Sequence, residues 1–129
     1  MKRKFTLMLA EDDETQRLLI QGVFEGEGYK VLPAPSVEDA LHVLANYTPD
    51  VIVSDVKMRE MDSFMFFDRI HNIARLQDIP FIFLTARSDS QSVGRSKKMG
   101  VAAYLTKSCD LDELLSTVQR LVSIRTVSE

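Results

Sequence analysis

The residues of this sequence that could carry out chemistry stand at the ends of short apolar segments or just after them. They are Glu11, Asp12, Asp13, Asp55, Thr85 and Lys107. If each apolar segment is a strand and helices connect the strands, these residues all lie at the carboxyl edge of one parallel sheet. Carboxylates that converge there repel one another and raise their own pKa values unless a cation lies among them, and oxygen ligands suit Mg²⁺. The sequence therefore predicts a magnesium site.

Asp55 could accept a phosphoryl group at such a site. Mg²⁺ would then bridge the phosphoryl oxygens to Asp12, while the Lys107 ammonium and the Thr85 hydroxyl would contact the remaining oxygens. Positioning and charge neutralisation of this kind are what phosphoryl transfer requires. The alternative, that each residue merely ends a strand, explains any one of them but predicts no matched set.

Five apolar segments could supply the strands that position these residues. They cover residues 5–10, 29–33, 50–55, 80–84 and 101–106. The third segment contains an unbroken Val-Ile-Val run, which is typical of a strand buried on both faces of a parallel sheet. Helical patterns follow each segment, and five strands that alternate with five helices predict a doubly wound α/β fold.

The first expected helix follows residues 11–13 and ends at residues 26–28, where two glycines occur. Its apolar stripe is formed by Leu18, Leu19, Val23 and Phe24. The next strand, which begins at Tyr29, is expected to stop at Pro33 and Pro35.

Capping residues and apolar stripes indicate the remaining helices. Ser36 and Asp39 resemble a capping box at the start of the second helix, and Asp62 is expected to cap the third. The third helix carries the apolar residues Phe64, Phe67, Ile70, Ile73 and Ala74. Residues 88–99 form a fourth helix with a weak apolar stripe, whereas the stripe of the fifth, which opens at Asp110, is the strongest in the chain.

The composition indicates one ordinary globular domain. The chain has 129 residues, of which 45% are hydrophobic and 27% charged. We assign residues 1–124 to the domain and residues 125–129 to a tail or the start of a linker. The net charge of -3 gives no basic surface for nucleic acid, and the first apolar segment is too short for a signal peptide or a membrane span. Because Cys109 is the single cysteine, no internal disulfide can form, which favours a reducing, cytoplasmic setting.

Five short motifs occur in a distinctive order. They are Leu-Ala-Glu11-Asp12-Asp13, Ser54-Asp55-Val-Lys-Met58, Met61-Asp62, Leu84-Thr85-Ala86 and Tyr104-Leu-Thr-Lys107. Through these motifs the chain, from about Lys4 to Leu121, resembles the receiver domain of two-component response regulators. The resemblance implies a five-stranded parallel sheet of flavodoxin-like order 2-1-3-4-5. It also implies a signalling module that takes a phosphoryl group from a histidine kinase or phosphotransfer protein and controls an output domain or target protein.

The resemblance implies a role for each acidic residue that matches the family. Asp55 is implied as the phosphoacceptor, and Asp12 as a direct Mg²⁺ ligand with Glu11 as its partner carboxylate. The backbone carbonyl of Lys57 is implied as a further ligand. Asp13 lies outside the usual acidic pair, so it is either a group that supports the ligands or a charge at a helix terminus.

The resemblance also implies how the signal leaves the site. Thr85 matches the switch hydroxyl, Lys107 the lysine that contacts the phosphoryl group, and Tyr104 an aromatic residue whose rotamer changes on phosphorylation. The alternative for Tyr104 is an ordinary half-buried strand tyrosine. The output surface is expected near the fourth helix, the fifth strand and the fifth helix, with a phosphorylation-dependent dimer as one way to use it.

The chain departs from the family pattern in two loops. Arg59 and Ser63 stand where the family commonly has Pro and Gly, which changes the allowed backbone shapes of the loop after Asp55. Ser108 replaces a proline that usually follows the lysine in a cis peptide. A cis bond before a non-proline residue costs roughly 2.5 to 4 kcal/mol, so we expect a trans peptide between Lys107 and Ser108.

Lys57 and Arg87 stand two residues after Asp55 and Thr85, at positions that tend in the family to set the lifetime of the phosphoryl group. The alternative is that both are solvated loop charges.

Two other functions compete with phosphorylation-controlled signalling, in which the domain catalyses only its own phosphorylation and dephosphorylation. One is a receiver-like docking module that works without phosphorylation, which the altered loops favour and the intact acidic residues oppose. The other is a phosphatase of the haloacid-dehalogenase kind, which requires a second Asp where Lys57 stands. The sequence predicts neither direct nucleic-acid binding nor membrane binding.

Overall fold

The computed structural model describes residues 4–55, 63–85, 100–106 and 111–128. The expected helix over residues 88–99 lies outside these ranges, as does the predicted trans peptide between Lys107 and Ser108. Asp62, the expected cap of the third helix, also lies outside them.

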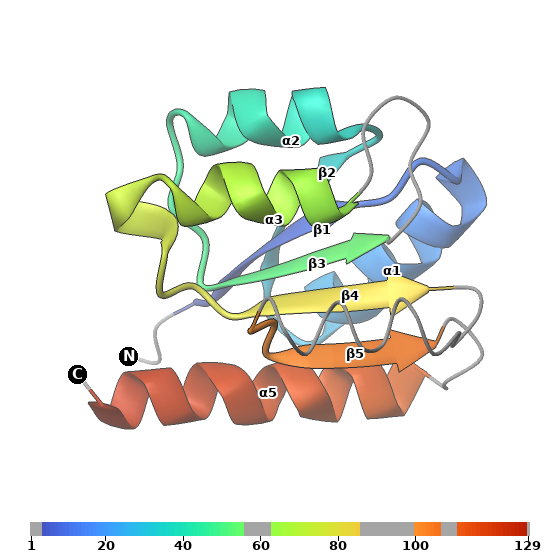
Figure 1. Ribbon diagram of the computed structural model, residues 1–129. Coiled ribbons are helices and arrows are strands. Elements are labelled where there is room, and N and C mark those ends of the chain that lie inside the picture. Colours follow the sequence, from blue (N-terminus) through green and yellow to red (C-terminus); the bar gives the residue numbers. More distant parts are fainter. Residues whose placement is uncertain (1–3, 56–62, 86–99, 107–110, 129) are drawn as a thin grey trace.

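Five parallel strands form one sheet in the order β2-β1-β3-β4-β5 (Figure 1). The strands are β1 Thr6–Ala10, β2 Lys30–Ala34, β3 Val51–Asp55, β4 Phe81–Thr85 and β5 Ala103–Thr106. The order confirms the prediction of a flavodoxin-like sheet. β3 lies at the centre, and all five of its residues are buried, as expected for a strand covered by helices on both faces.

Four α-helices cover the two faces of the sheet within the described part of the chain. They are α1 Glu14–Gly26, α2 Val37–Leu44, α3 Ser63–His71 and α5 Leu111–Ser128, and a short 3-10 helix, η1, spans Ala74–Leu76. α2 and α3 cover one face, and α1 and α5 cover the other (Figure 1). Because all five strands are parallel, their carboxyl ends all point the same way, to the right in Figure 1.

The two faces of the sheet carry different cores. The face under α2 and α3 is rich in phenylalanine, and its rings meet mostly edge to face. Phe83, for example, lies 5.2 Å from Phe81 and 4.9 Å from Phe64 between ring centroids. The face under α1 and α5 is mainly aliphatic. Each core buries side chains from the sheet and from its helices, so strand and helix positions are fixed together.

The prediction for the buried face of α1 was wrong at two residues. α1 buries Ile20 and Phe24, whereas Leu18 and Leu19 are 57% and 51% exposed. Ile20 and Phe24 are four residues apart and therefore lie on one side of a helix. Leu18, Leu19 and Ile20 are consecutive, so they cannot all face the core, and packing against the sheet selects Ile20.

The prediction that Pro33 and Pro35 stop the second strand was wrong for Pro33 only, since β2 ends at Ala34, directly before Pro35. Pro33 lies inside β2 and pairs with Leu9 of β1. β2 is an edge strand, so the N–H that proline lacks is not needed for a ladder hydrogen bond on the open side.

Several element ends differ from the sequence prediction. α3 ends at His71, so Ile73, which is 37% exposed, and Ala74 lie beyond it. α5 continues to Ser128 and so includes most of the segment 125–129. Ser36 does cap α2 as predicted, because its hydroxyl oxygen accepts a 3.1 Å hydrogen bond from the Asp39 N–H.

No helix in the described ranges is long and apolar enough to span a membrane.

Candidate functional site

Three carboxylates converge at the carboxyl edge of the sheet. Glu11 and Asp12 follow β1, Asp55 ends β3, and one carboxylate oxygen of each lies within 4.8 Å of the others. The pairing of Ala10 with Ser54 brings the ends of β1 and β3 side by side. The sequence predicted this convergence from the position of the acidic residues after their strands.

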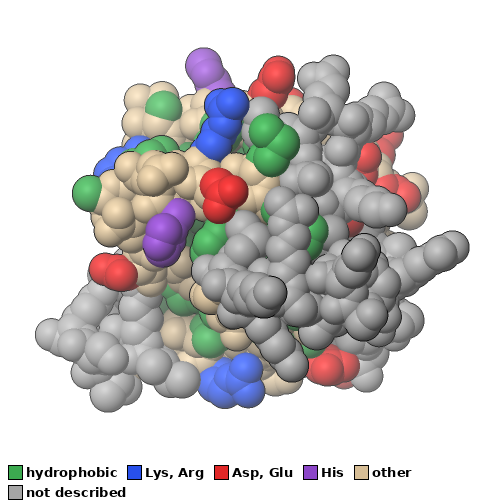
Figure 2. Space-filling view, in the orientation of Figure 1, with side chains coloured by type: hydrophobic (Ala, Val, Ile, Leu, Met, Phe, Trp, Pro, Cys, Tyr) green, Lys and Arg blue, Asp and Glu red, His purple; other side chains and the backbone are tan. Residues whose placement is uncertain are grey.

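Two of the three carboxylates are buried. Glu11 is 1% exposed and Asp55 8% exposed, while Asp12 is partly exposed. Figure 2 shows acidic side chains on the side of the molecule toward which the strand arrows of Figure 1 point. Neighbouring buried carboxylates are costly unless positive charge compensates them. Three carboxylates gathered in this way offer oxygen ligands, the kind that a hard divalent cation such as Mg²⁺ prefers.

Backbone and side-chain hydrogen bonds hold the acidic segment after β1. The Glu11 N–H donates to the Ala34 carbonyl oxygen at 3.0 Å, which extends the pairing of β1 with β2 by one residue. Glu11 Oε2 accepts a 3.3 Å hydrogen bond from the Asp13 N–H. Arg17 Nη1, from α1, donates to the Glu11 carbonyl oxygen at 3.0 Å. The acidic segment is thus attached both to the sheet and to the helix that follows it.

Asp13 has a different role from the acidic residues before it. Its side chain is exposed, and its Oδ1 accepts a 3.1 Å hydrogen bond from the Gln16 N–H at the start of α1. Asp13 is therefore the N-cap of α1, where a negative charge is favourable beside the N–H groups of the first turn. Of the two alternatives for this residue, the structure supports the charge at a helix terminus.

The strand register places the carboxyl ends of β4 and β5 at the same edge of the sheet as Asp55. Asp55 pairs with Leu84, so Thr85 is one residue further toward the same edge, and Thr85 pairs with Thr106. Lys107 is the residue after Thr106. Lys107 and the Thr85 hydroxyl lie outside what the structure describes, and so do Lys57 and Arg87.

Tyr104 lies on β5 and is half-buried. Its ring centroid is 6.4 Å from that of Phe83, with which it pairs across β4 and β5, and the rings are tilted by 69°. It lies two residues before Thr106 and therefore on the same face of the strand. This position agrees with either interpretation of Tyr104, a switch residue or an ordinary strand tyrosine.

Sequence analysis missed Arg17. Its side chain donates to the carbonyl oxygen of Glu11, and every residue type has a backbone carbonyl, so the sequence does not show which one Arg17 contacts. The one available signal is a basic residue in the first turns of a helix that follows an acidic segment.

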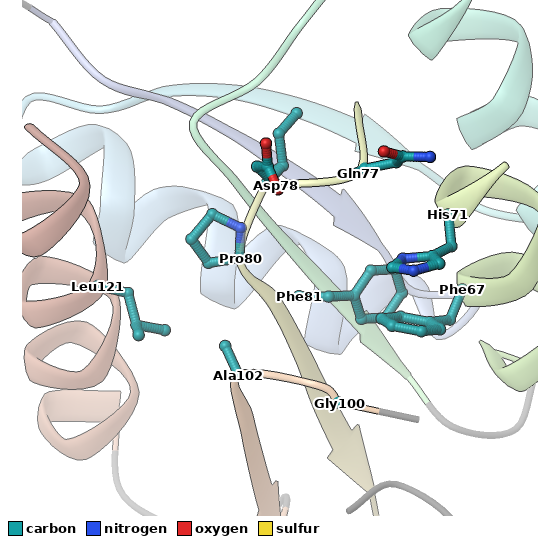
Figure 3. A pocket seen from close by; sticks show the side chains of 10 residues that line it. Phe67, His71, Gln77, Asp78, Pro80, Phe81, Gly100, Ala102 and Leu121 are labelled. Atoms are coloured by element: carbon teal, nitrogen blue, oxygen red, sulfur yellow. The ribbon is translucent and has the colours of Figure 1, made fainter. Parts of the chain in front are cut away.

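A pocket of about 390 Å³ lies at the other end of the sheet (Figure 3). Pro80, which precedes β4, lines it, and Leu121 reaches it from α5. Phe67 and His71 of α3 line it with rings stacked at 5.5 Å. Because Pro80 and Asp55 are at opposite ends of neighbouring parallel strands, this pocket is separate from the carboxylates.

The fold and the acidic edge agree with a family comparison. Residues 7–119 match the family model described as the response regulator receiver domain. The chain belongs to the response regulator receiver domain family, as the sequence motifs predicted. Receiver domains typically bind Mg²⁺ through acidic residues, and the carboxylates of Glu11, Asp12 and Asp55 form such a cluster here.

Individual relatives support the same conclusion. The chain is 34% identical over 114 residues to an "uncharacterized 14.6 kDa protein in sodA1 3′ region" of Leptolyngbya boryana, and the match covers 88% of this chain and 87% of the relative. It is 31% identical over 124 residues to the response regulator Rre1 of Synechocystis, and the match covers 95% of this chain and 54% of Rre1. The chain thus spans about half the length of that second relative.

A solved structure with a similar fold is the signal receiver domain of a signal transduction histidine kinase from Syntrophus aciditrophicus. Its TM-score is 0.85 at 34% identity, and the match covers 92% of this chain and 90% of that one. Receiver domains therefore occur among the relatives both in response regulators and in a histidine kinase.

Proposed function

We propose that Asp55 accepts a phosphoryl group from a histidine kinase or a histidine phosphotransfer protein in a Mg²⁺-dependent reaction. The observation that carries the proposal is the convergence of the Glu11, Asp12 and Asp55 carboxylates within 4.8 Å at the carboxyl edge of the sheet. The resulting phosphoaspartate controls an output domain or a target protein.

In the proposed reaction, a carboxylate oxygen of Asp55 attacks the phosphorus of a phosphohistidine. The new bond joins this oxygen to phosphorus, the bond between phosphorus and the imidazole nitrogen breaks, and the released imidazole takes up a proton. Asp55 is suited to this step because it ends the central strand, where the buried backbone fixes its position. The Ser54 hydroxyl donates to the Asp55 carbonyl oxygen at 3.2 Å and further orders the strand end.

Glu11, Asp12 and Asp55 would hold Mg²⁺ together with the backbone carbonyl of Lys57. When bound, the ion supplies positive charge that offsets the repulsion between the carboxylates and the incoming phosphoryl group. The residues of the chain then have two tasks, which are to keep these oxygens together and to exclude other ligands.

Thr85 at the end of β4 and Lys107 after β5 complete the proposed site. The Thr85 hydroxyl and the Lys107 ammonium contact phosphoryl oxygens that are not bound to the metal. Movement of Thr85 toward the phosphoryl group lets Tyr104 change rotamer, which alters the surface near residues 88–99, β5 and α5. Lys57 and Arg87 tune the lifetime of the phosphoryl group.

The proposed phosphodonor is a protein that approaches α1. α1 starts directly after the acidic segment and presents Leu18 and Leu19, both more than half exposed, to solvent. Two large apolar side chains next to a charged site favour contact with a protein surface rather than with a small polar substrate. The domain itself acts on no separate substrate, contacts neither nucleic acid nor membrane, works in the cytoplasm, and can dimerise when phosphorylated.

Intact mass spectrometry after incubation with acetyl phosphate and Mg²⁺ tests the proposal. The wild-type protein should gain one phosphoryl group, and Asp55→Asn should gain none. Asp13→Asn is the matched control, because Asn also caps helices well and Asp13 lies outside the carboxylate cluster. It should gain the group as the wild type does, and removal of Mg²⁺ with a chelator should prevent the gain in both.

If the folded wild-type protein gains no mass under these conditions, the phosphoacceptor proposal is wrong. The chain would then act as a receiver-like docking module that does not use phosphorylation. The changes at Arg59, Ser63 and Ser108 are the sequence features that favour this second function.

A further inference from the structure

Arg17 connects α1 to the acidic segment twice. Its backbone N–H donates to the Asp13 carbonyl oxygen at 2.9 Å, in the first turn of the helix. Its side-chain Nη1 donates to the Glu11 carbonyl oxygen at 3.0 Å. The side chain is partly buried, so it reaches back along the protein rather than out into solvent.

The carbonyl that Arg17 contacts belongs to the peptide between Glu11 and Asp12. A peptide unit is planar, so fixing the direction of its carbonyl limits the backbone rotation on both sides of it. Those rotations set where the two carboxylates point. One hydrogen bond from Arg17 therefore restrains both acidic residues that β1 contributes to the cluster.

Two further contacts hold the segment on either side of this peptide. The Glu11 N–H donates to the Ala34 carbonyl oxygen, and this hydrogen bond fixes the end of β1 just before the Glu11–Asp12 peptide. The bond from the Asp13 N–H to Glu11 Oε2 orders the turn after it. The hydrogen bond from Arg17 acts on the peptide between these two points.

We propose that Arg17 is a positioning residue of the metal site: it orients the Glu11–Asp12 peptide so that both carboxylates face Asp55. The inference rests on the proposed function, since it concerns the same magnesium site. Because Arg17 contacts a backbone oxygen, it orders the ligands without using a carboxylate oxygen as its acceptor. Its guanidinium also brings a positive charge beside the acidic segment, which lowers the repulsion between carboxylates before the metal binds.

Mg²⁺ titration followed through the backbone amide signals of residues 11–13 tests the inference without any phosphodonor. Arg17→Met keeps most of the apolar stem and removes the donor. It should weaken Mg²⁺ binding about tenfold, which corresponds to about 1.4 kcal/mol. Arg17→Lys, which keeps the charge and can still donate, should recover part of the affinity. At saturating Mg²⁺, phosphorylation of Arg17→Met by acetyl phosphate should return close to the wild-type rate.

Arg75→Met is the matched control. Arg75 also donates to backbone carbonyl oxygens, but to those of Leu44, which ends α2, and of Tyr47, which follows α2, and not to the acidic segment. Its replacement should lower stability and leave the Mg²⁺ affinity unchanged. If Arg17→Met does not fold, Arg17→Gln is measured instead, because its side chain is polar but shorter.

Three results would overturn the inference. The first is an unchanged or tighter Mg²⁺ affinity in the folded Arg17 variant. The second is an equal loss of affinity in Arg75→Met, which would mean that Arg17 acts through general stability. The third is a wild-type protein that binds no Mg²⁺. Failure of phosphorylation alone would overturn the proposed function, whereas a loss of Mg²⁺ affinity confined to Arg17 would still support the positioning role.

Discussion

The side-chain carboxylate of Asp50 accepts a 2.8 Å hydrogen bond from the backbone N–H of Thr6. In return, the Asp50 N–H donates to the Thr6 carbonyl oxygen at 2.8 Å. Asp50 is 6% exposed and directly precedes β3, while Thr6 begins β1. The pair therefore joins the amino ends of these two neighbouring strands, at the end of the sheet opposite to Asp55.

Asp50→Ala should lower the free energy of unfolding by about 1 to 3 kcal/mol, because the partly buried Thr6 N–H loses an acceptor. Asp50→Asn keeps an acceptor oxygen and should lose less. Urea unfolding of the three proteins measures the difference. A loss below about 0.5 kcal/mol for the Ala variant, the range of an ordinary surface substitution, would contradict a stabilising role for the pair.

A second prediction concerns the buried face of α1. Ile20 is fully buried, so Ile20→Ala should cost about 2 to 5 kcal/mol of unfolding free energy. Leu18 is 57% exposed, so Leu18→Ala should change the free energy by less than about 0.5 kcal/mol. Equal or reversed effects in urea unfolding would mean that α1 presents to the sheet the face that the sequence pattern first indicated.

The difference at α1 shows which features a sequence of this kind predicts. The acidic residues after residues 5–10 and at the end of residues 50–55 are predictable, because parallel connections bring the carboxyl ends of all strands to one edge. The rotation of α1 is not, because Leu18, Leu19 and Ile20 are adjacent and only contact with the sheet decides among them. Pro33 was misplaced for a similar reason, since only the strand order reveals that β2 is an edge.

The residues of the site likewise include some that the sequence predicted and one that it did not. The convergence of Glu11, Asp12 and Asp55 was predicted because all three stand at the carboxyl ends of parallel strands. The shared cation that would offset their repulsion stays a prediction. Arg17 was not predicted, because its hydrogen bond goes to a backbone oxygen, and backbone geometry is not visible in residue types. Asp13 remained open until the structure showed its bond to the Gln16 N–H.

A third prediction concerns Tyr29, which lies between α1 and the sheet. Its ring meets that of Phe24 edge to face at 5.3 Å, and its side chain is 7% exposed. Burial raises the pKa of Tyr29 above its usual value of about 10, and the negative charge of Glu27 raises it further. The folded protein therefore holds the phenol proton more tightly than the unfolded chain does.

Protonated Tyr29 therefore adds to the free energy of unfolding. This contribution is fully present below about pH 10, the pKa of the unfolded chain, and is lost as the pH rises through the higher pKa of the folded state. Urea unfolding from about pH 8 to pH 11 should show wild-type stability falling more steeply than that of Tyr29→Phe. Tyr47→Phe is the control at an exposed tyrosine and should follow the wild-type profile. Parallel profiles for wild type and Tyr29→Phe would contradict the prediction.

A fourth prediction links the carboxylate cluster to stability. If Mg²⁺ binds the folded protein alone, Mg²⁺ at ten times its dissociation constant should raise the free energy of unfolding by about 1.4 kcal/mol. Asp12→Asn should lose this gain, because it removes one of the three clustered carboxylates. Asp13→Asn, at the exposed cap of α1, should keep it.

The same variants should behave differently when a chelator removes the metal. Without metal, the free energy of unfolding of Asp12→Asn should equal that of the wild type or exceed it by up to about 1 kcal/mol. This is the repulsion energy of two charges about 4 Å apart in a water-like medium, which the substitution removes. Such a gain would mean that the three carboxylates are kept together for metal binding at a cost in stability. An Asp12→Asn variant that is less stable than the wild type in chelator, or that keeps the Mg²⁺-dependent gain, would instead show that Asp12 serves the fold and not the metal.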